Sequence, residues 1–501
     1  MEVEIDTALP GEADVLVVGA GNAALCAALA AAEGGASVLV VECAPKEERG
    51  GNSSFTAGAM RVAYKGPEDI QQLVPDLSPA DLDNTDFGSY TEDEFFDDMA
   101  RLTEYRSNPD LVELLVQRSF DTLDWMRSKG VRFVPIYGRQ AFKIDGKFKF
   151  WGGLTLEANG GGPGLVSFLV DACNKAGVTI AYQTRAIELL TQGGSIVGVT
   201  VQREGMSQEV RANAVVLASG GFQANAEWRT RYLGPGWDLA KVRGTRFNTG
   251  GGLDMALRIG ASPAGQWSGC HAVQWDMNAP EFGDLAVGDG FQKHSYPFGV
   301  LVNNDGKRFL DEGADFRNYT YAKYGREILE QPAQMAWQVF DAKIQLRDEY
   351  RIPQVSKVTA PSLEELAKAM DGMNVADFLK TINEYNAAVD TSVPFNPNVL
   401  DGRRTIGLEI AKTNWANTID TPPFEAYMVG CGITFTFGGL RINTGAEVLN
   451  HDASPIPGLY ACGEIVGGLF YFNYPGGAGL TAGSVFGRIA GQNAAQFSNA
   501  S

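Results

Sequence analysis

The 501-residue chain is short of basic residues, cysteine and histidine, and each shortage excludes a class of protein. The 41 Lys and Arg against 60 Asp and Glu give a net charge of −19, which argues against binding to a nucleic-acid backbone. The six cysteines are scattered and include no C-x-x-C pair, so neither a metal site nor a disulfide framework is indicated. With three histidines in the whole chain, each one is a candidate for function.

A long apolar run is also missing. The longest strongly apolar helical stretch, Ala23 to Ala32, is about half of what spans a bilayer. The acidic start MEVEIDTALPGE has no apolar core of the kind found in signal peptides. We therefore expect a soluble cytoplasmic protein with reduced cysteines.

Glycine, in contrast, is abundant, and its first cluster predicts a dinucleotide site. The loop G-A-G-N-A-A follows a buried-strand run and opens an alanine-rich helix. Gly19 allows the tight turn, Gly21 admits a pyrophosphate, and Ala24 keeps helix and strand close. A second strand, 37–41, ends at Glu42, where a carboxylate can hold ribose hydroxyls.

A second glycine cluster lies close to the other end, in YFNYPGGAGLTAGSVFGRIAG, Tyr471 to Gly491. Glycines before a helix let backbone amides approach a ligand without side chains in the way. The helix that starts near Leu480 would point its N-terminus, with partial positive charge, at that ligand. The alternative is a glycine-rich contact between two helices. The two clusters suggest one ligand held from both ends of the chain.

Four further stretches carry a family resemblance: RGGNSSFTAGAMR (49–61), TRAIELL (184–190), NAVVLASGGFQAN (213–225) and GLYACGEIVGG (458–468). In this order they resemble the FAD-dependent flavoproteins of the fumarate reductase and succinate dehydrogenase superfamily. GNAALCAALAA, GGNSS, DEGADFRNYTYAKYG and GITFTFGG look most like tricarballylate dehydrogenases. The resemblance implies an α/β fold. It has a Rossmann-type FAD-binding domain (1–262 and 424–501) and an inserted α+β capping domain (263–423).

The same resemblance implies a set of cofactor-binding residues for FAD. They are Gly19, Gly21, Asn22, Ala23, Glu42, Cys43, Gly50, Gly51, Asn52, Ser53, Gly58, Ala186, Ala218, Ser219, Gly220, Gly463, Glu464, Gly479 and Leu480. Family members with histidyl-FAD carry a histidine after the G-G loop. Ser53-Ser54-Phe55-Thr56 has none, so we expect FAD to be bound non-covalently.

Candidates for catalysis lie in the predicted cap. By resemblance to fumarate reductases, His271 and Arg308 would bind substrate, and Arg317 would transfer a proton. Tyr319 is an alternative acid–base group, followed by Tyr321. Alternatives without chemistry are a hydrogen-bonded structural histidine at 271, and a surface ion pair of Arg317 with Asp311, Glu312 or Asp315. No glutamate stands near His294, where those enzymes have a proton relay.

At two positions this sequence departs from the motifs with which fumarate reductases bind their substrate. Phe435-Thr436-Phe437 replaces the H-T-x of fumarate reductases, and Tyr474-Pro475-Gly476 replaces their R-x-G. Thr436 and Tyr474 are then expected to contact the substrate. Ketosteroid dehydrogenases of the superfamily carry Tyr-Pro-Gly at this position. The pocket is therefore expected to be more aromatic and less cationic than a fumarate or succinate site.

Together these residues predict an FAD-dependent dehydrogenase or reductase acting on a carbon–carbon bond next to a carboxylate or carbonyl. A hydride would pass between the substrate and flavin N5. One alternative is a ketosteroid-type desaturase, and another is an electron-transfer flavoprotein subunit that needs a membrane partner. The expected partners are a small-molecule substrate and an unspecified electron acceptor, with a membrane or redox protein among the candidates.

Overall fold

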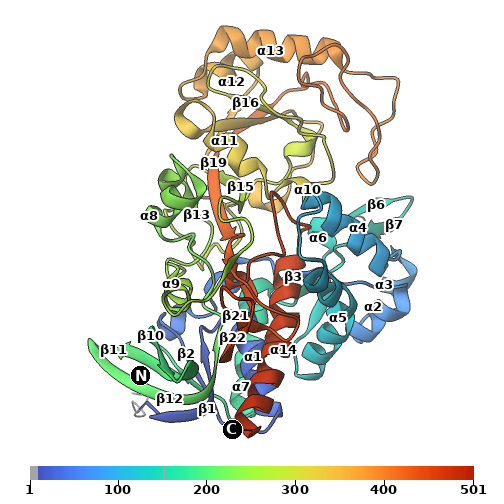
Figure 1. Ribbon diagram of the computed structural model, residues 1–501. Helices are drawn as coiled ribbons and strands as arrows, with labels where there is room; N and C mark the ends of the chain where they lie inside the picture. Colours follow the sequence, from blue (N-terminus) through green and yellow to red (C-terminus); the bar gives the residue numbers. More distant parts are fainter. Residues whose placement is uncertain (1–8, 151–152, 501) are drawn as a thin grey trace, which may run out of the picture.

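The computed structural model describes residues 9–150 and 153–500, and the first eight residues of the expected FAD-binding domain lie outside this part. Two sheets organise the described residues, one at the bottom of Figure 1 and one near the top. Long loops lie between them, and the strand β19 (Phe424–Thr436) of the upper sheet extends into this space. The candidate site lies in this middle layer.

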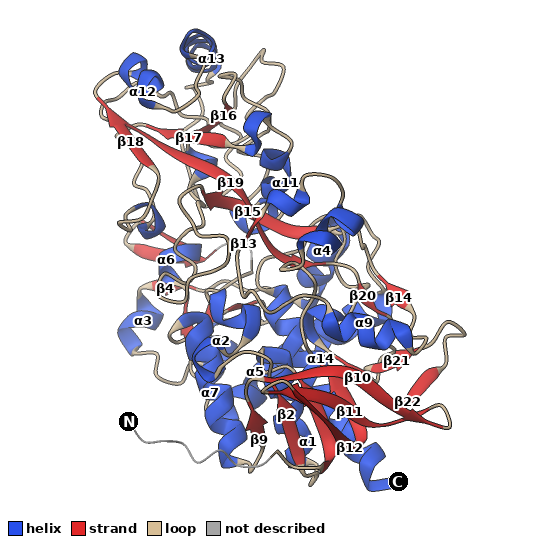
Figure 2. Cartoon of the chain, turned by 90° about the vertical axis from the view of Figure 1, so that its left-hand side faces the viewer, coloured by secondary structure: helices blue, strands red, loops and turns tan. Residues whose placement is uncertain are grey.

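The lower sheet has eight strands within the described residues, in the order β10-β11-β12-β1-β2-β9, with β22 paired to β12 and β21 to β22 (Figure 2). Its strands are β1 (Glu12–Val18), β2 (Val38–Val41), β9 (Thr179–Ala181), β10 (Thr184–Gln192), β11 (Ser195–Arg203), β12 (Met206–Leu217), β21 (Glu447–Leu449) and β22 (Pro455–Ala461). Strands β22, β12, β1, β2 and β9 are parallel. Val15–Val18 and β2 are buried throughout, as parallel strands with both faces covered must be.

Two helices meet on this sheet: α1 (Asn22–Glu33) and α14 (Ala478–Ala500). Glycines on α14 let the two backbones approach closely. A Cβ at Gly491 would lie 2.1 Å from the carbonyl oxygen of Ala27, and one at Gly487 would lie 2.5 Å from that of Ala23. The glycine-rich helix contact considered from the sequence is therefore present. It accounts for these glycines but not for Gly476, Gly477 and Gly479, which lie at the start of the helix.

The upper sheet has six strands within the described residues, in the order β13-β19-β17-β16, with β15 and β18 also paired to β19. Its strands are β13 (Lys241–Val242), β15 (Cys270–Asp276), β16 (Val300–Asn303), β17 (Ala336–Phe340), β18 (Lys357–Ala360) and β19. The sheet crosses both expected domain boundaries, because β13 and β19 lie in segments assigned to the FAD-binding domain. An inserted cap remains our proposal, and its sheet extends beyond 263–423.

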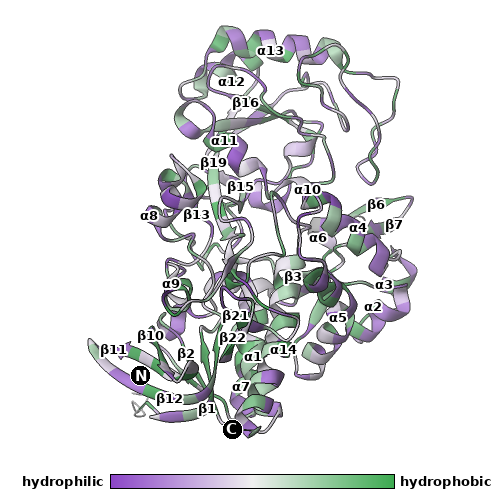
Figure 3. Ribbon diagram, in the orientation of Figure 1, coloured by the Kyte–Doolittle hydropathy of each residue, from purple (hydrophilic) through white to green (hydrophobic). Residues whose placement is uncertain are grey.

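The helix α13 (Val375–Ala388) covers the far side of the upper sheet in Figure 1. Phe378, Ile382 and Tyr385 recur at helical spacing and are buried in the core of this half. Figure 3 shows the matching alternation of hydrophilic and hydrophobic residues along α13.

The remaining helices are α2 (Pro67–Leu73), α3 (Pro79–Asp83), α4 (Glu92–Leu102), α5 (Pro109–Ser128), α6 (Tyr137–Gln140), α7 (Gly161–Lys175), α8 (Ala226–Trp228), α9 (Gly251–Arg258), α10 (Arg317–Thr320), α11 (Tyr324–Leu329) and α12 (Leu363–Ala369). Three small sheets complete the described part of the chain. One contains β3 (Ala59–Met60), β8 (Leu156–Ala158) and β5 (Phe133–Pro135), and another contains β4 (Thr85–Asp86), β7 (Lys147–Phe150) and β6 (Ala141–Ile144). The third pairs β14 (Pro263–Ala264) with β20 (Gly439–Leu440). No helix in the described ranges is long and apolar enough to cross a membrane.

Candidate active site

A cavity at the carboxyl ends of β1 and β2 gathers most of the predicted cofactor-binding residues. Those that line it are Gly19, Gly21, Asn22, Ala23, Glu42, Cys43, Gly50, Gly51, Asn52, Ser53, Ala186, Ala218, Ser219, Gly220, Gly463 and Glu464. We call this space the nucleotide cavity. Thr245, Phe247, Asn248 and Gly252 also line it and were not among the predicted residues.

Gly58 is not part of the nucleotide cavity lining, and its role in binding FAD stays a prediction. A Cβ at this position would lie 2.7 Å from the carbonyl carbon of Gly161, and its φ is +71°. Gly58 therefore allows the loop to pack against the start of α7, which is a structural role.

The residues present fit a dinucleotide. Gly19 has φ +108°, and a Cβ there would lie 2.5 Å from the carbonyl oxygen of Ala218, so only glycine allows this approach. The N-terminus of α1 faces the cavity and offers backbone amides to a pyrophosphate. The Glu42 carboxylate accepts hydrogen bonds from the amides of Ala20 (2.7 Å) and Ala44 (2.8 Å), which fixes it at the end of β2.

A second cavity adjoins the first, and six residues line both: Asn22, Ala23, Asn52, Ser53, Gly463 and Glu464. We call it the reaction cavity. Gly479 and Leu480 line this one rather than the nucleotide cavity. Asn22 Nδ2 donates to the Leu480 carbonyl (2.9 Å) and to Ser484 Oγ (3.0 Å), so the starts of α1 and α14 are joined directly. The two glycine clusters therefore meet at one place, as the sequence suggested.

Glu464 lies at the junction of the two cavities. Its carboxylate accepts hydrogen bonds from the Thr436 amide (3.0 Å), from Gln223 Nε2 (3.3 Å) and from Asn248 Nδ2 (3.3 Å). Burial nevertheless raises the pKa of Glu464 to about 7. A carboxyl group that can change its protonation state near neutral pH is thus placed between the cavities.

His271 lies on β15 in an aromatic cage inside the reaction cavity. Its ring centroid is 4.9 Å from those of Tyr321 and Tyr474 and 5.2 Å from that of Phe435. Neither ring nitrogen has a hydrogen-bond partner within the described part of the chain. Burial, together with Arg243, holds the pKa of His271 well below its usual range. The imidazole is therefore neutral, and the hydrogen-bonded structural histidine considered from the sequence is not what the structure contains.

Arg317 is buried in the reaction cavity, where Nη1 lies 3.0 Å from Nδ1 of His294. Its guanidinium also lies over the ring of Tyr321, 5.9 Å from the centroid. The surface ion pair considered from the sequence is wrong, since Asp315 binds Arg101 and Glu312 binds Arg308. The Asp311 carboxylate accepts from the Gly313 amide and from Thr413 Oγ1.

Two other predicted residues lie outside the reaction cavity lining and are corrected. Arg308 forms a bidentate ion pair with Glu312 (3.0 and 2.5 Å) in the core of the upper half. Tyr319 donates its hydroxyl to Asp98 Oδ2 at 2.6 Å. The other two predicted substrate-binding residues, Thr436 and Tyr474, do line the cavity. The Tyr474 hydroxyl contacts that of Tyr321, and burial raises the pKa of Tyr474 well above its usual range.

Sequence reasoning missed Arg243, Asp289 and Gln292, which also line the reaction cavity. Arg243 forms a buried ion pair with Asp289, with Nε and Nη2 at 3.0 and 2.5 Å from Oδ1. No motif surrounds these residues. They come from a short strand end and from a long loop, and only the folded chain brings them together.

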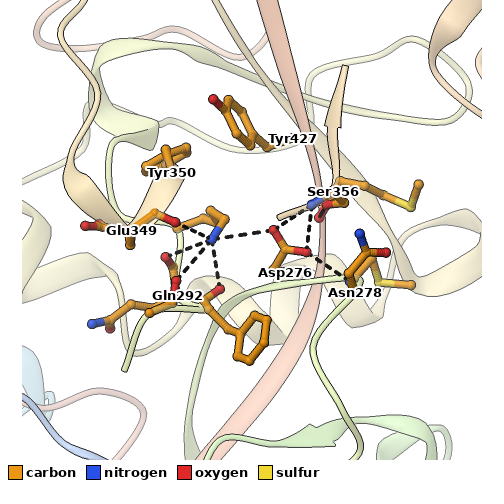
Figure 4. Close-up of polar contacts among 12 residues, drawn as sticks. Asp276, Asn278, Gln292, Glu349, Tyr350, Ser356 and Tyr427 are labelled. Atoms are coloured by element: carbon orange, nitrogen blue, oxygen red, sulfur yellow. Dashed lines mark hydrogen bonds and ion pairs between the residues drawn. The ribbon is translucent and has the colours of Figure 1, made fainter. Parts of the chain in front are cut away.

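The loop that carries Asp289, Gln292 and His294 is fixed from beneath by a buried ammonium group. Lys293 Nζ lies 3.5 Å from Asp276 Oδ2 and donates to the carbonyl of Glu349 at 3.1 Å. Figure 4 shows Asp276, Gln292 and Glu349 around this group. Burial lowers the pKa of Lys293. The ammonium also binds carbonyls of residues 290, 291 and 292, which holds the loop in place.

The nucleotide cavity thus opens into the buried reaction cavity, which lies beneath a second sheet. This is the arrangement of an FAD-dependent oxidoreductase with a capping domain. The open conformation of a flavocytochrome c3 fumarate reductase shares it, with a TM-score of 0.72 and 29% identity over 98% of this chain and 79% of that chain. A 3-ketosteroid Δ1-dehydrogenase from Sterolibacterium denitrificans gives a TM-score of 0.75 over 97% of this chain and 100% of that chain. At 21% identity, it shows the fold alone.

Residues 14–480 match the family model described as FAD binding domain, and the chain belongs to this family. A probable fumarate reductase of Shewanella frigidimarina is 31% identical over 490 residues, which are 96% of this chain and 74% of that protein. The expected superfamily and the expected FAD cofactor are thereby confirmed. The chain is an FAD-dependent dehydrogenase or reductase acting on carbon–carbon bonds.

Proposed function

We propose that this flavoprotein oxidises or reduces a carbon–carbon bond next to a carboxylate or carbonyl, as tricarballylate dehydrogenase-like enzymes do. Bound FAD would supply the hydride acceptor or donor at flavin N5. The observation that supports this most is the contact of Arg317 with His294 in a cavity that shares six residues with the nucleotide cavity.

Arg317 is proposed to move the proton on the carbon next to the carboxylate or carbonyl. An arginine keeps its proton in water, but in a desolvated site it can protonate a carbanion. Because a guanidinium only donates hydrogen bonds, His294 accepts at Nδ1 and carries its own proton on Nε2. His294 then orients Arg317, and its Nδ1 is an acceptor to which the guanidinium can pass a proton.

His271, Thr436 and Tyr474 are proposed to bind the substrate. The neutral imidazole of His271 offers one donor and one acceptor nitrogen, which suits a carboxylate or carbonyl oxygen. The aromatic rings around it exclude water and strengthen each polar contact in the cavity.

A ketosteroid-type desaturase is the second candidate. The contact between the hydroxyls of Tyr321 and Tyr474 favours it, because such a pair can donate to a ketone oxygen. Phe435 and Phe437 add an apolar wall to the same cavity. The proposal has two further parts. The flavin exchanges electrons with an unspecified acceptor, for which a redox protein or a membrane partner is a candidate. The protein is located in the cytoplasm.

Anaerobic reduction of the flavin by a panel of carboxylic acids and cyclic ketones tests the proposal. We expect saturated acids with an abstractable proton next to the carboxylate to bleach the flavin absorbance. Bleaching by ketones alone would favour the desaturase. A flavin that no saturated compound bleaches and that, once reduced, no unsaturated acid or enone reoxidises would contradict both candidates.

A further inference from the structure

We propose that Asp98 is a positioning residue for Arg317. It would hold the segment 315–321 against α4 and so keep Arg317 beside His294. The inference rests on the proposed function, in which Arg317 transfers the proton. Nothing in the sequence pointed to Asp98, and it lies outside the reaction cavity lining.

Asp98 is a buried carboxylate that accepts hydrogen bonds on both oxygens. The hydroxyls of Tyr319 and Tyr90 each lie 2.6 Å from Oδ2, and Arg61 Nη1 lies 3.3 Å from it. Arg101 binds Oδ1 through Nε (3.0 Å) and Nη2 (2.8 Å). Charge-assisted bonds of this kind are about twice as strong as neutral ones, so the cluster is a rigid anchor for Tyr319.

The chain on both sides of Arg317 is held as well, through the Asp315 side chain before it and through backbone carbonyls after it. Arg101 Nη1 binds Asp315 at 2.8 Å, two residues before Arg317. The Gly476 amide donates to the Asn318 carbonyl (3.0 Å), and Asn473 Nδ2 donates to the Tyr319 carbonyl (2.7 Å). The loop before α14 and the helix α4 therefore contact the segment 315–321 from two sides and hold it in place.

Because α10 is helical, the anchoring of Tyr319 also fixes the position of the Arg317 side chain. Side chains in a helix are rotated by about 100° per residue, so Tyr319 points away from the side occupied by Arg317. Tyr321 is four residues from Arg317 and lies under its guanidinium. If Tyr319 loses its anchor, α10 can rotate about its axis, and that rotation moves Nη1 away from His294. A displacement of about 1 Å can cost about 10²-fold in rate.

Hydrogen–deuterium exchange of the flavin-loaded enzyme provides the first test, with Asp98→Asn and the milder Tyr319→Phe as variants. The amides of Tyr319 and Tyr321 are hydrogen-bonded within the segment, and we expect their exchange to become at least several-fold faster. Exchange in α1 and α14 should stay as in the wild type. Tyr385→Phe is the matched control, because this tyrosine is buried in the upper core and its hydroxyl has no partner among the described residues. Unchanged exchange at 319 and 321, or faster exchange throughout, would overturn the proposal.

Turnover provides the second test, in the form of a double-mutant cycle. Using the compound that bleaches the flavin fastest, we expect Asp98→Asn to lower kcat about 10–100-fold with little change in KM. In an Arg317→Lys background, Asp98→Asn should add almost nothing, because both changes act on the same proton transfer. Losses that multiply would overturn the positioning role. An Arg317→Lys enzyme with wild-type turnover would instead contradict the proposed function, so the two failures can be told apart.

Discussion

Arg317 Nη1 lies 3.0 Å from His294 Nδ1, and both side chains are buried in the cavity that joins the nucleotide cradle. The two residues come from different segments of the upper half, 23 positions apart. The contact places a fixed donor against a ring nitrogen that can only accept, which sets the tautomer of His294. Four of the predictions below concern residues that line the two cavities.

Replacing Arg317 by lysine should keep the fold and the FAD content but lose most turnover. Lysine carries the charge but not the planar fork, so its donor would lie off the line to the carbanion. We expect kcat to fall by about 10²–10⁴. Arg351→Lys, at an exposed ion pair with Glu425, is the control and should keep wild-type kcat. Equal turnover in both variants would contradict the assignment.

FAD should leave the protein intact on acid precipitation. No histidine or cysteine lies between Ser53 and Gly58, the stretch where superfamily members with histidyl-FAD carry a histidine. The measurement is the flavin absorbance of the supernatant compared with that of the pellet. Flavin retained in the pellet would show a covalent bond.

Glu42→Ala should weaken FAD binding by about 1.5–3 kcal/mol, the size of a lost hydrogen bond to a charged group. The carboxylate is held by two amides at the end of β2, in the position that suits ribose hydroxyls. Titration of apoprotein with FAD measures the change. Glu113→Ala, on the exposed face of α5, should bind FAD as the wild type does. Equal affinity for all three proteins would mean that Glu42 only braces the loop.

His271→Phe should raise KM for an acid substrate more than it lowers kcat. The ring fits the aromatic cage, but both nitrogens are lost, so substrate binding suffers while the proton transfer by Arg317 remains. Because the pKa of His271 is held well below its usual range, the effect should be the same across neutral pH. Wild-type KM in a flavin-loaded variant would remove His271 from the binding residues.

Glu464 should make the apoprotein less stable as the pH rises. Its pKa is raised from 4.5 to about 7, so within this window the folded state holds a proton that the unfolded chain has lost. Stability is therefore lost with rising pH, by up to about 3 kcal/mol. Between about pH 5 and about pH 8, the Tm of Glu464→Gln should fall less than that of the wild type. Glu409→Gln, at an exposed cap position, should follow the wild type.

The nucleotide cavity could be predicted from the sequence because its signals are local. Gly19, Gly21 and Glu42 stand at fixed distances along one strand–helix–strand unit, and their chemistry depends on backbone geometry within that unit. The start of α14, expected near Leu480 and found at Ala478, carries the same local signal. Gly58 shows a limit of this signal, because a glycine that packs against α7 looks the same in sequence as one needed for a ligand.

The reaction cavity was harder to predict, since its residues meet only through long-range packing. Tyr319 and Tyr321 were both predicted to be alternative acid–base groups to Arg317. In the structure the segment is one turn of helix, so their side chains diverge and only Tyr321 lines the cavity. Arg243 and Asp289 lie 46 positions apart, and no sequence pattern around either residue indicates that they form an ion pair.

The hydrogen bonds from Asn22 to Leu480 and Ser484 have a consequence for the order of events during synthesis. The ribosome delivers the first glycine loop long before α14, so the residues of α14 that line the reaction cavity are the last to join the site. We expect FAD to be captured only after α14 has emerged, when the upper half has already had time to fold. A chain that stops before Ala478 should accordingly bind no FAD, even if its remaining sheet is folded.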